Sequence, residues 1–189
     1  MEKDPVRLQG VGFVRAALLF YAGVLVVALA IAAVAGHSPL HAPGATRTVD
    51  WLRDPLVGFL AAGIVISLSA LLTASTRWGE ALAQALAELL GPLSLRDCVL
   101  LAAASGVAEE ALFRGALQPL LGWVGASLLF GLAHFVPRRE LLPWVAFTFA
   151  AGFGLGWLYE ATGNLVAPVC AHAGVNAVNL RLLARRVSP

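Results

Sequence analysis

The sequence predicts an all-α protein that crosses a membrane several times, as a bundle of about six transmembrane helices around a polar intramembrane cavity. Composition is the first reason: 59% of the 189 residues are hydrophobic, 13% are charged and the mean hydropathy is +0.82. Soluble domains carry about 25% charged residues, so lipid must cover much of a chain this poor in charge. The second reason is the length of the apolar segments, because about 20 residues cross a bilayer core of roughly 30 Å. Six segments are candidates: 11–35, 55–76, 96–117, 120–136, 141–161 and 165–184.

The first segment, 11–35, predicts a retained helix and not a cleaved signal peptide. Its apolar run is longer than the core of a cleaved signal peptide. The third segment holds three charges and the fourth is short, so these two are the weakest candidates. Cys98 and Cys170 both lie in apolar runs, which favours small buried side chains over a disulfide or a metal pair. With no internal repeat or linker, residues 1–189 are expected to form one transmembrane domain.

Between the second and third segments, residues 79–90 show a different pattern. Apolar side chains recur there at helical spacing, and Glu80, Gln84 and Glu88 fall on the other face. This pattern is typical of an amphipathic helix that lies in the membrane interface. A gate for substrate and a simple connector are both compatible with it.

The distribution of basic residues predicts the orientation, since cytoplasmic loops are enriched in Lys and Arg. With the N-terminus inside, the external segments hold Arg47 and Arg53, whereas ten basic residues face the cytoplasm. These ten are Lys3, Arg7, Arg15, Arg77, Arg96, Arg138, Arg139, Arg181, Arg185 and Arg186. Both termini are therefore expected to be cytoplasmic. The expected surroundings are a lipid bilayer, and no nucleic acid partner is expected.

Six polar side chains remain inside the apolar segments, where ionisable groups are costly and are candidates for function. They are Glu109, Glu110, Arg114, His134, His172 and Asn176. His37 and His41 fall instead in the first external loop and are expected to be solvated.

Glu109 and Glu110 are neighbours, so on a helix their side chains point about 100° apart. Arg114 follows Glu110 by four residues, shares its face and is within reach of an ion pair. This spacing predicts a structural role for Glu110 and leaves Glu109 freer to act as a base. A buried Glu–Arg pair that only fixes the helix register is the competing interpretation.

His172 and Asn176 are spaced i, i+4 and project from one helix face, where two such donors could meet a developing oxyanion. Hydrogen bonding between membrane helices is the alternative for both, and for His134. At 1.5 Å per residue, His134 falls deeper toward the cytoplasm than Glu109 and His172. A kink between Pro119 and Gly125 is one explanation for this difference in depth.

Three sequence motifs resemble those of a known family and occur in the same order. AEEALFRGAL is similar to the EExxxR motif of the CAAX-protease and bacteriocin-processing family of intramembrane glutamic endopeptidases, FGLAH to its FxxxH motif and HAGVN to its HxxxN motif. A TGNL stretch, 162–165, shortly before the last motif also fits. The resemblance covers 95–183, the expected protease core.

The resemblance implies a role for each residue in hydrolysis of a peptide bond. Glu109 would activate a water molecule that His134 helps to bind, and His172 and Asn176 would stabilise the oxyanion. Glu110 and Arg114 would support Glu109. No metal and no cofactor are implied.

The same resemblance leaves the substrate open. It implies a membrane-associated protein or peptide, with C-terminal processing, sorting-signal cleavage or bacteriocin-type maturation as candidate reactions. An Ala- and Arg-rich, Lys-poor composition favours a prokaryotic cell membrane as the location, which makes prenylated CAAX substrates unexpected.

Three other functions stay open at this point. A zinc protease could use His134, His172 and a glutamate as ligands, although the chain has no HExxH motif. A transporter could use the carboxylates and histidines as a proton relay, but transporters often show repeats, and here the polar residues lie in the C-terminal half. A non-catalytic immunity or scaffold protein would bind a peptide without cutting it.

Overall fold

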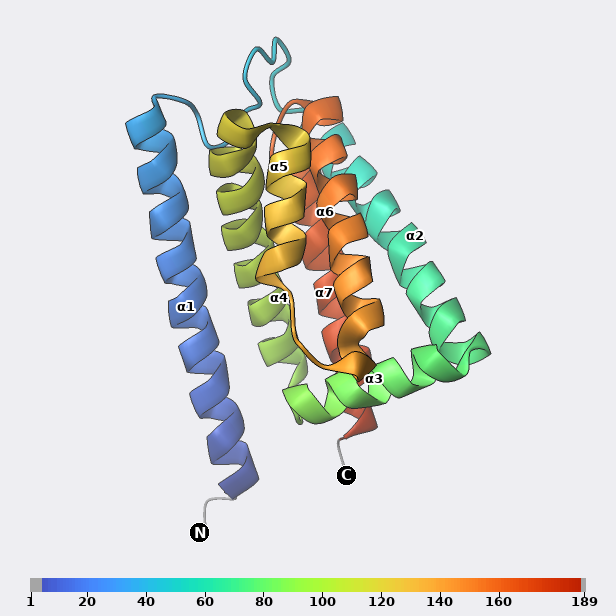
Figure 1. The fold of residues 1–189 in the computed structure, drawn as a ribbon. Helices are drawn as coiled ribbons and strands as arrows, with labels where there is room; N and C mark the ends of the chain where they lie inside the picture. Colours follow the sequence, from blue (N-terminus) through green and yellow to red (C-terminus); the bar gives the residue numbers. More distant parts are fainter. Residues whose placement is uncertain (1–4, 188–189) are drawn as a thin grey trace.

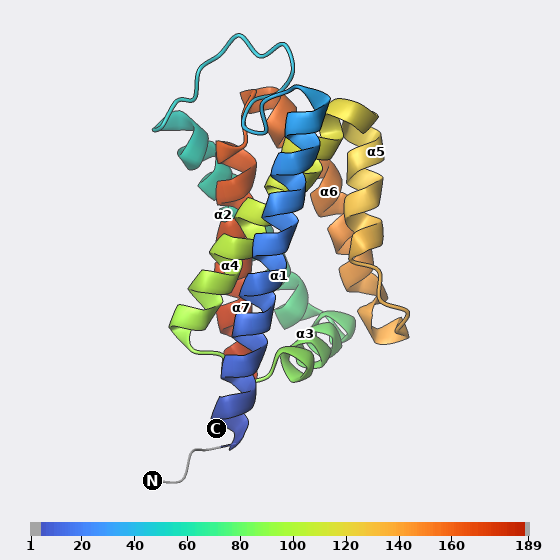
Figure 2. The same ribbon diagram turned by 90° about the vertical axis from the view of Figure 1, so that its left-hand side faces the viewer.

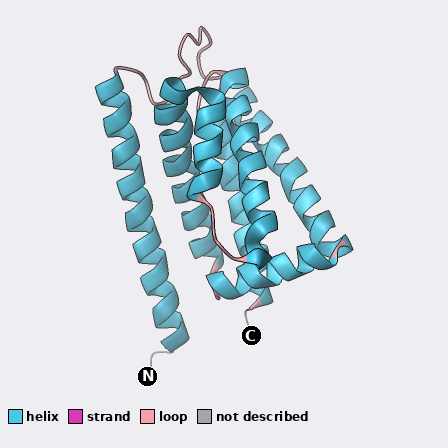
Figure 3. Ribbon diagram, in the orientation of Figure 1, coloured by secondary structure: helices cyan, strands magenta, loops and turns pink. Residues whose placement is uncertain are grey.

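The computed structural model describes residues 5–187, and within them the chain is helical without a regular strand (Figures 1 and 3). The predicted all-α class is therefore confirmed. In chain order the elements are α1 (Pro5–Ala35), α2 (Arg53–Ser75), α3 (Arg77–Leu90), α4 (Leu95–Glu110), the π-helix η1 (Ala111–Leu117), α5 (Gln118–Ala133), the 3₁₀ turn η2 (Arg139–Leu141), α6 (Leu142–Thr162) and α7 (Val166–Arg186). Lys3, one of the ten basic residues that predict the orientation, lies outside the described residues.

The long helices form a bundle, and α3 lies across one end of it (Figures 1 and 2). The bundle end that α3 covers is also the end where α1 begins and α7 ends. Helix α7 is central, because it packs against α2, α3, α4 and α6. The loop between α1 and α2 covers the opposite end (Figure 2).

Four helical segments of the described chain are long and apolar enough to cross a membrane: Gly12–Ala35, Arg53–Ser75, Leu95–Ala133 and Arg139–Thr162. The third contains the predicted segment 96–117 and most of 120–136, and the chain reverses direction at Gly122 (φ 72°, ψ 167°) inside it. Helix α7 forms where 165–184 predicts a helix, but it is too polar to meet the same criterion. Its polar residues are tolerated because neighbouring helices cover them.

The outer surface of the bundle is apolar, as contact with lipid requires. Large hydrophobic side chains are exposed along several helices, among them Leu19 on α1 (74%), Ile64 on α2 (71%) and Trp157 on α6 (58%). Exposed apolar surface on this scale marks contact with a membrane or a partner. Together with the apolar spans, this surface is consistent with a membrane helical bundle.

Helix α3 confirms the predicted amphipathic helix at 79–90. Thr76 caps it by accepting a hydrogen bond from the backbone N–H of Gly79. Ala83 and Ala87 are buried against the bundle, whereas Gln84 and Glu88 are exposed. An ion pair from Glu80 to Arg186 at the end of α7 (2.6 Å) ties the helix to the bundle.

At the opposite end, the turn between α6 and α7 is joined to the start of α2. The Asn164 side chain donates to the buried carboxylate of Asp54 (2.7 Å), and its carbonyl oxygen accepts from the backbone N–H of Val166 (2.9 Å). Gly163 supplies the left-handed turn (φ 74°) that ends α6. The TGNL stretch thus has a structural role. As predicted, Cys98 and Cys170 are free thiols, the first buried and the second half-buried.

Candidate active site

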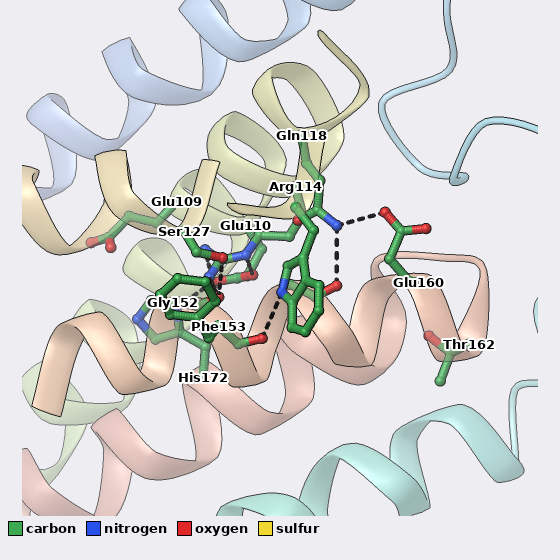
Figure 4. A network of polar contacts seen from close by, with 12 residues as sticks. Glu109, Glu110, Arg114, Gln118, Ser127, Gly152, Phe153, Glu160, Thr162 and His172 are labelled. Carbon is green, nitrogen blue, oxygen red and sulfur yellow. Dashed lines mark hydrogen bonds and ion pairs between the residues drawn. The ribbon is translucent and has the colours of Figure 1, made fainter. Parts of the chain in front are cut away.

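The predicted polar residues lie on, or directly after, four elements of the bundle that meet in its interior. Glu109 and Glu110 end α4, Arg114 lies in η1, His134 follows α5, and His172 and Asn176 lie on α7. Figure 4 shows Glu110, Arg114 and His172 converging, with the Glu109 side chain directed away from them. A π-helical turn next to this cluster is consistent with a functional site, because such turns are rare elsewhere.

The reversal at Gly122 explains why His134 meets Glu109. Glu109 lies roughly 20 Å before the turn and His134 roughly 18 Å after it, at 1.5 Å per residue. The helices before and after Gly122 form a hairpin, and its two legs therefore bring these side chains to the same depth. The kink expected between Pro119 and Gly125 is present, and it removes the difference in depth that the sequence left unexplained.

Glu110 and Arg114 form the predicted ion pair in the interior. The Nε of Arg114 lies 3.2 Å from Oε2 of Glu110, and a second guanidinium nitrogen donates to Oε1 at 3.3 Å. The side chains are 0% and 1% exposed. Arg114 also donates to the carbonyl oxygen of Gly152 on α6 (2.9 Å) and lies over the ring of Phe130. The pair thus joins η1 to α6 as well as to α4.

Glu110 has a second partner that the sequence did not indicate. Its Oε1 lies 2.7 Å from Nδ1 of His172. Because an ionised carboxylate only accepts, Nδ1 of His172 carries the hydrogen and donates. The contact fixes the ring orientation, since the other ring nitrogen, Nε2, is then directed away from Glu110. Glu110 is therefore a link between Arg114 and His172, besides any support it gives to Glu109.

Glu109 lies against His134 on the other side of the cluster. Oε2 of Glu109 is 3.3 Å from Nε2 of His134. The Nδ1 of His134 lies 2.8 Å from the carbonyl oxygen of Phe130 and must donate to it, because a carbonyl oxygen only accepts. The Nε2 atom that faces Glu109 thus has a lone pair, or a proton that makes the ring cationic. A carboxylate and an imidazole in this arrangement can share a proton.

The two glutamates differ in their access to small molecules. The side chain of Glu109 is 12% exposed and that of His134 is 22% exposed, whereas Glu110 is fully buried. Two aromatic rings flank His134, Phe130 at 4.5 Å and Trp144 at 5.7 Å between ring centroids. The side chains of Glu109 and His134 are therefore partly exposed, although Oε2 of Glu109 is itself buried, whereas Glu110 is confined to its protein partners.

Asn176 does not contact the glutamates. Its amide nitrogen donates to the hydroxyl of Ser105 on α4 (2.9 Å). His172 and Asn176 do share one face of α7, as predicted, and that face packs on α4. Ser105 is buried and was not predicted as a site residue. Its position four residues before Glu109, on the same helix face, is a signal that could have identified it.

A second polar network lies beside the first, between α5 and α6 (Figure 4). Gln118 donates to Glu160 (2.8 Å) and to the carbonyl oxygen of Gly156 (3.1 Å), and the indole of Trp123 donates to the carbonyl oxygen of Phe153 (2.9 Å). The Trp123 bond holds the leg after Gly122 against α6, and the Gln118 bonds hold the residues before the turn against the same helix.

Metal binding was a competing prediction for the cluster. Among residues 5–187, no three side chains of His, Cys, Asp and Glu are grouped so that they could hold a metal ion. The geometry therefore gives the zinc hypothesis no added support.

Comparison with known proteins places the cluster within a matched segment. Residues 91–178 match the sequence model of a family described as type II CAAX prenyl endopeptidase Rce1-like. A stretch of 93 residues is 42% identical to the uncharacterized protein YpbD of Bacillus subtilis (strain 168) and covers 48% of each chain. The chain thus spans about half the length of that curated relative. No solved structure matches the chain.

The resemblance to the CAAX-protease family is thereby confirmed over this segment, which contains all six predicted site residues. These matches are a likeness at the level of the family, and they cover less than half of the chain. Helices α1, α2 and α3 lie entirely outside the matched segment.

Proposed function

We propose that the protein is an intramembrane endopeptidase in which Glu109 activates the attacking water, without a metal ion. The contact between Glu109 and His134 carries the proposal, because it places a partly exposed carboxylate and an imidazole 3.3 Å apart among apolar helices. Glu110 cannot take the same role, since Arg114 and His172 occupy its oxygens. The family match of residues 91–178 supports peptide-bond hydrolysis as the reaction class.

In the proposed reaction, Glu109 accepts a proton from a water molecule that His134 helps to hold. The water oxygen then forms a bond to the carbon of the substrate's peptide carbonyl. As the tetrahedral intermediate collapses, the C–N bond breaks and Glu109 returns the proton to the leaving amine. Proton and water are balanced in this sequence, so no co-reactant is needed.

His172 and Asn176 are the proposed donors to the oxyanion. Asn176 has two amide hydrogens, and Ser105 takes one of them, which leaves the second for the substrate. For His172, Nδ1 donates to Glu110, and Nε2 donates when the ring is cationic, with Glu110 balancing that charge. Donors held in place before the reaction stabilise developing charge most effectively.

The proposed substrate is a membrane-associated protein or peptide, cut during C-terminal processing, sorting-signal cleavage or bacteriocin-type maturation. The proposed location is a prokaryotic cell membrane with both chain ends in the cytoplasm. The common bundle end at which α1 begins and α7 ends is compatible with that orientation. In that orientation the loop between α1 and α2 lies outside the cell.

The test compares membrane fractions of cells that express wild-type protein or Glu109→Gln at matched levels. Peptide termini are read by mass spectrometry, with Glu140→Gln as the control, since Glu140 is exposed and lies outside the cluster. We expect uncleaved precursors to accumulate with Glu109→Gln and not with Glu140→Gln. Identical termini in all three samples would refute the protease. Loss of cleavage in a chelator would refute the metal-free reaction and favour a zinc protease.

A further inference from the structure

Two hydrogen bonds tie α7 to α4, and each holds one of the two proposed donors to the oxyanion. Glu110 accepts from His172 (2.7 Å), and the hydroxyl of Ser105 accepts from the amide nitrogen of Asn176 (2.9 Å). Both acceptors belong to α4, and both donors belong to α7. Glu110 is part of the EExxxR motif, whereas Ser105 precedes that motif and belongs to none of the three.

Helices α4 and α7 approach closely enough for short side chains to meet. Gly106, next to Ser105, faces Ala173 of α7, and a Cβ atom at position 106 would lie 3.0 Å from the Cβ and from the backbone nitrogen of Ala173. Small residues at such contacts let membrane helices pack closely. Because serine and asparagine both have short side chains, the bond between Ser105 and Asn176 depends on this close approach.

The hydroxyl of Ser105 determines which end of the Asn176 amide faces α4. Ser105 is 3% exposed, and its one proton is donated to the carbonyl oxygen of Ala102 on the same helix (3.2 Å). The remaining lone pairs of the hydroxyl only accept, so the amide nitrogen of Asn176 faces Ser105 and the amide oxygen does not. The nitrogen is thereby held toward α4, the helix that also carries Glu109. An amide that was free to turn over could present its oxygen there, which would repel a developing oxyanion.

We propose that Ser105 is a positioning residue for Asn176. It holds the amide nitrogen toward α4, so that the second N–H is oriented before the substrate's carbonyl oxygen develops charge. Donors that are fixed in advance stabilise such charge most effectively, because they need no reorganisation during the reaction. The inference rests on the proposed function, in which Asn176 is a donor to the oxyanion, and it adds a residue from outside the three motifs.

A thermal double-mutant cycle tests the contact without any substrate. Ser105→Ala, Asn176→Ala and the double variant are purified in one detergent and melted beside the wild-type protein. We expect the change in melting temperature caused by Ser105→Ala to be about 2–4 °C more unfavourable in the wild-type background than beside Asn176→Ala, because only the first background has a hydrogen bond to lose. Equal changes in both backgrounds would overturn the contact.

Kinetics then test the positioning role, with the precursor that the terminus comparison identifies as the probe. Asn176→Ala should lower kcat by about a hundredfold or more, as removal of an oxyanion donor does. Ser105→Ala should lower kcat by about tenfold with KM unchanged, because the donor is still present but is no longer held for the transition state. Beside Asn176→Ala, Ser105→Ala should have no further effect on kcat, since it acts through the amide that is then missing.

Thr148→Val is the matched control, since Thr148 lies on α6 and its buried hydroxyl also donates to its own helix, at the carbonyl oxygen of Val145 (2.8 Å). This variant should keep the wild-type kcat. A Ser105→Ala protein with the wild-type kcat, or with the same loss of kcat in both backgrounds, would overturn the positioning role alone. A wild-type protein that cleaves nothing would refute the proposed function and the positioning role with it, whereas the thermal cycle would still decide the contact.

Discussion

Removing the carboxylate of Glu110 tests how the interior of the site is held. Its oxygens lie 3.2 and 3.3 Å from two nitrogens of Arg114 and 2.7 Å from Nδ1 of His172. In Glu110→Ala, the guanidinium of Arg114 stays buried with the carbonyl oxygen of Gly152 as its remaining acceptor. Leaving one partner of a buried pair alone costs about 3–5 kcal/mol, a large part of the 5–15 kcal/mol that typically stabilises a protein. We expect Glu110→Ala to lose stability on this scale.

A variant that removes both charges separates the ion pair from the contact with His172. In the double variant Glu110→Leu with Arg114→Leu, no uncompensated charge remains, and such replacements are often neutral for stability. We expect it to recover most of the stability that Glu110→Ala loses. Cleavage should stay low in both, because His172 has lost the partner of its Nδ1 in each.

The assay is thermal unfolding of purified protein in one detergent, together with cleavage of the identified precursor. Glu140→Ala serves as the control, since that carboxylate is exposed and outside the cluster. A Glu110→Ala protein that melts like wild type would refute the ion-pair reasoning. A double variant no more stable than the single one would refute it too, because the cost would then come from lost packing.

Two further predictions concern the two ends of the bundle. Asn164→Ala removes the donor to buried Asp54, so we expect the free energy of unfolding to fall by about 1–3 kcal/mol; an unchanged melting curve would contradict a stabilising role for this hydrogen bond. Arg186 holds the pKa of Glu80 below its ordinary value, so the tie between α3 and α7 is present at neutral pH and is lost as the pH falls through that lowered pKa. Hydrogen exchange of α3 amides should therefore rise only in acid, whereas Glu80→Gln should raise it at neutral pH as well; equal exchange in both proteins would contradict this tie.

The number and order of the helices followed from the sequence because membrane spans depend on length and hydropathy. The i, i+4 pair of Glu110 and Arg114 followed from helix geometry alone, and both nitrogen–oxygen contacts are present. The sixth segment, 165–184, was predicted as a span and forms α7, which is too polar to meet the hydropathy criterion for a membrane span and packs against α2, α4 and α6.

Contacts between helices could not be predicted in the same way. Nothing in the spacing of Glu110 and His172, 62 residues apart, indicates that they meet, since that contact depends on how α4 and α7 pack. Ser105 escaped notice for a related reason. A single serine is common in an apolar helix, and only the packing of α4 on α7 brings it to Asn176.

Two adjacent glutamates can take different roles here because each helical residue turns the side chain by about 100°. Glu110 points to α7 and η1, where His172 and Arg114 meet its charge in the absence of solvent. Glu109 points to the hairpin leg that follows Gly122, where His134 is partly open. Exchanging the two environments would require rotating α4, which its packing against α1 and α7 prevents. The division between a carboxylate that holds the structure and one that can accept a proton is therefore set by helix geometry, and the kink at Gly122 supplies the histidine that makes the second one useful.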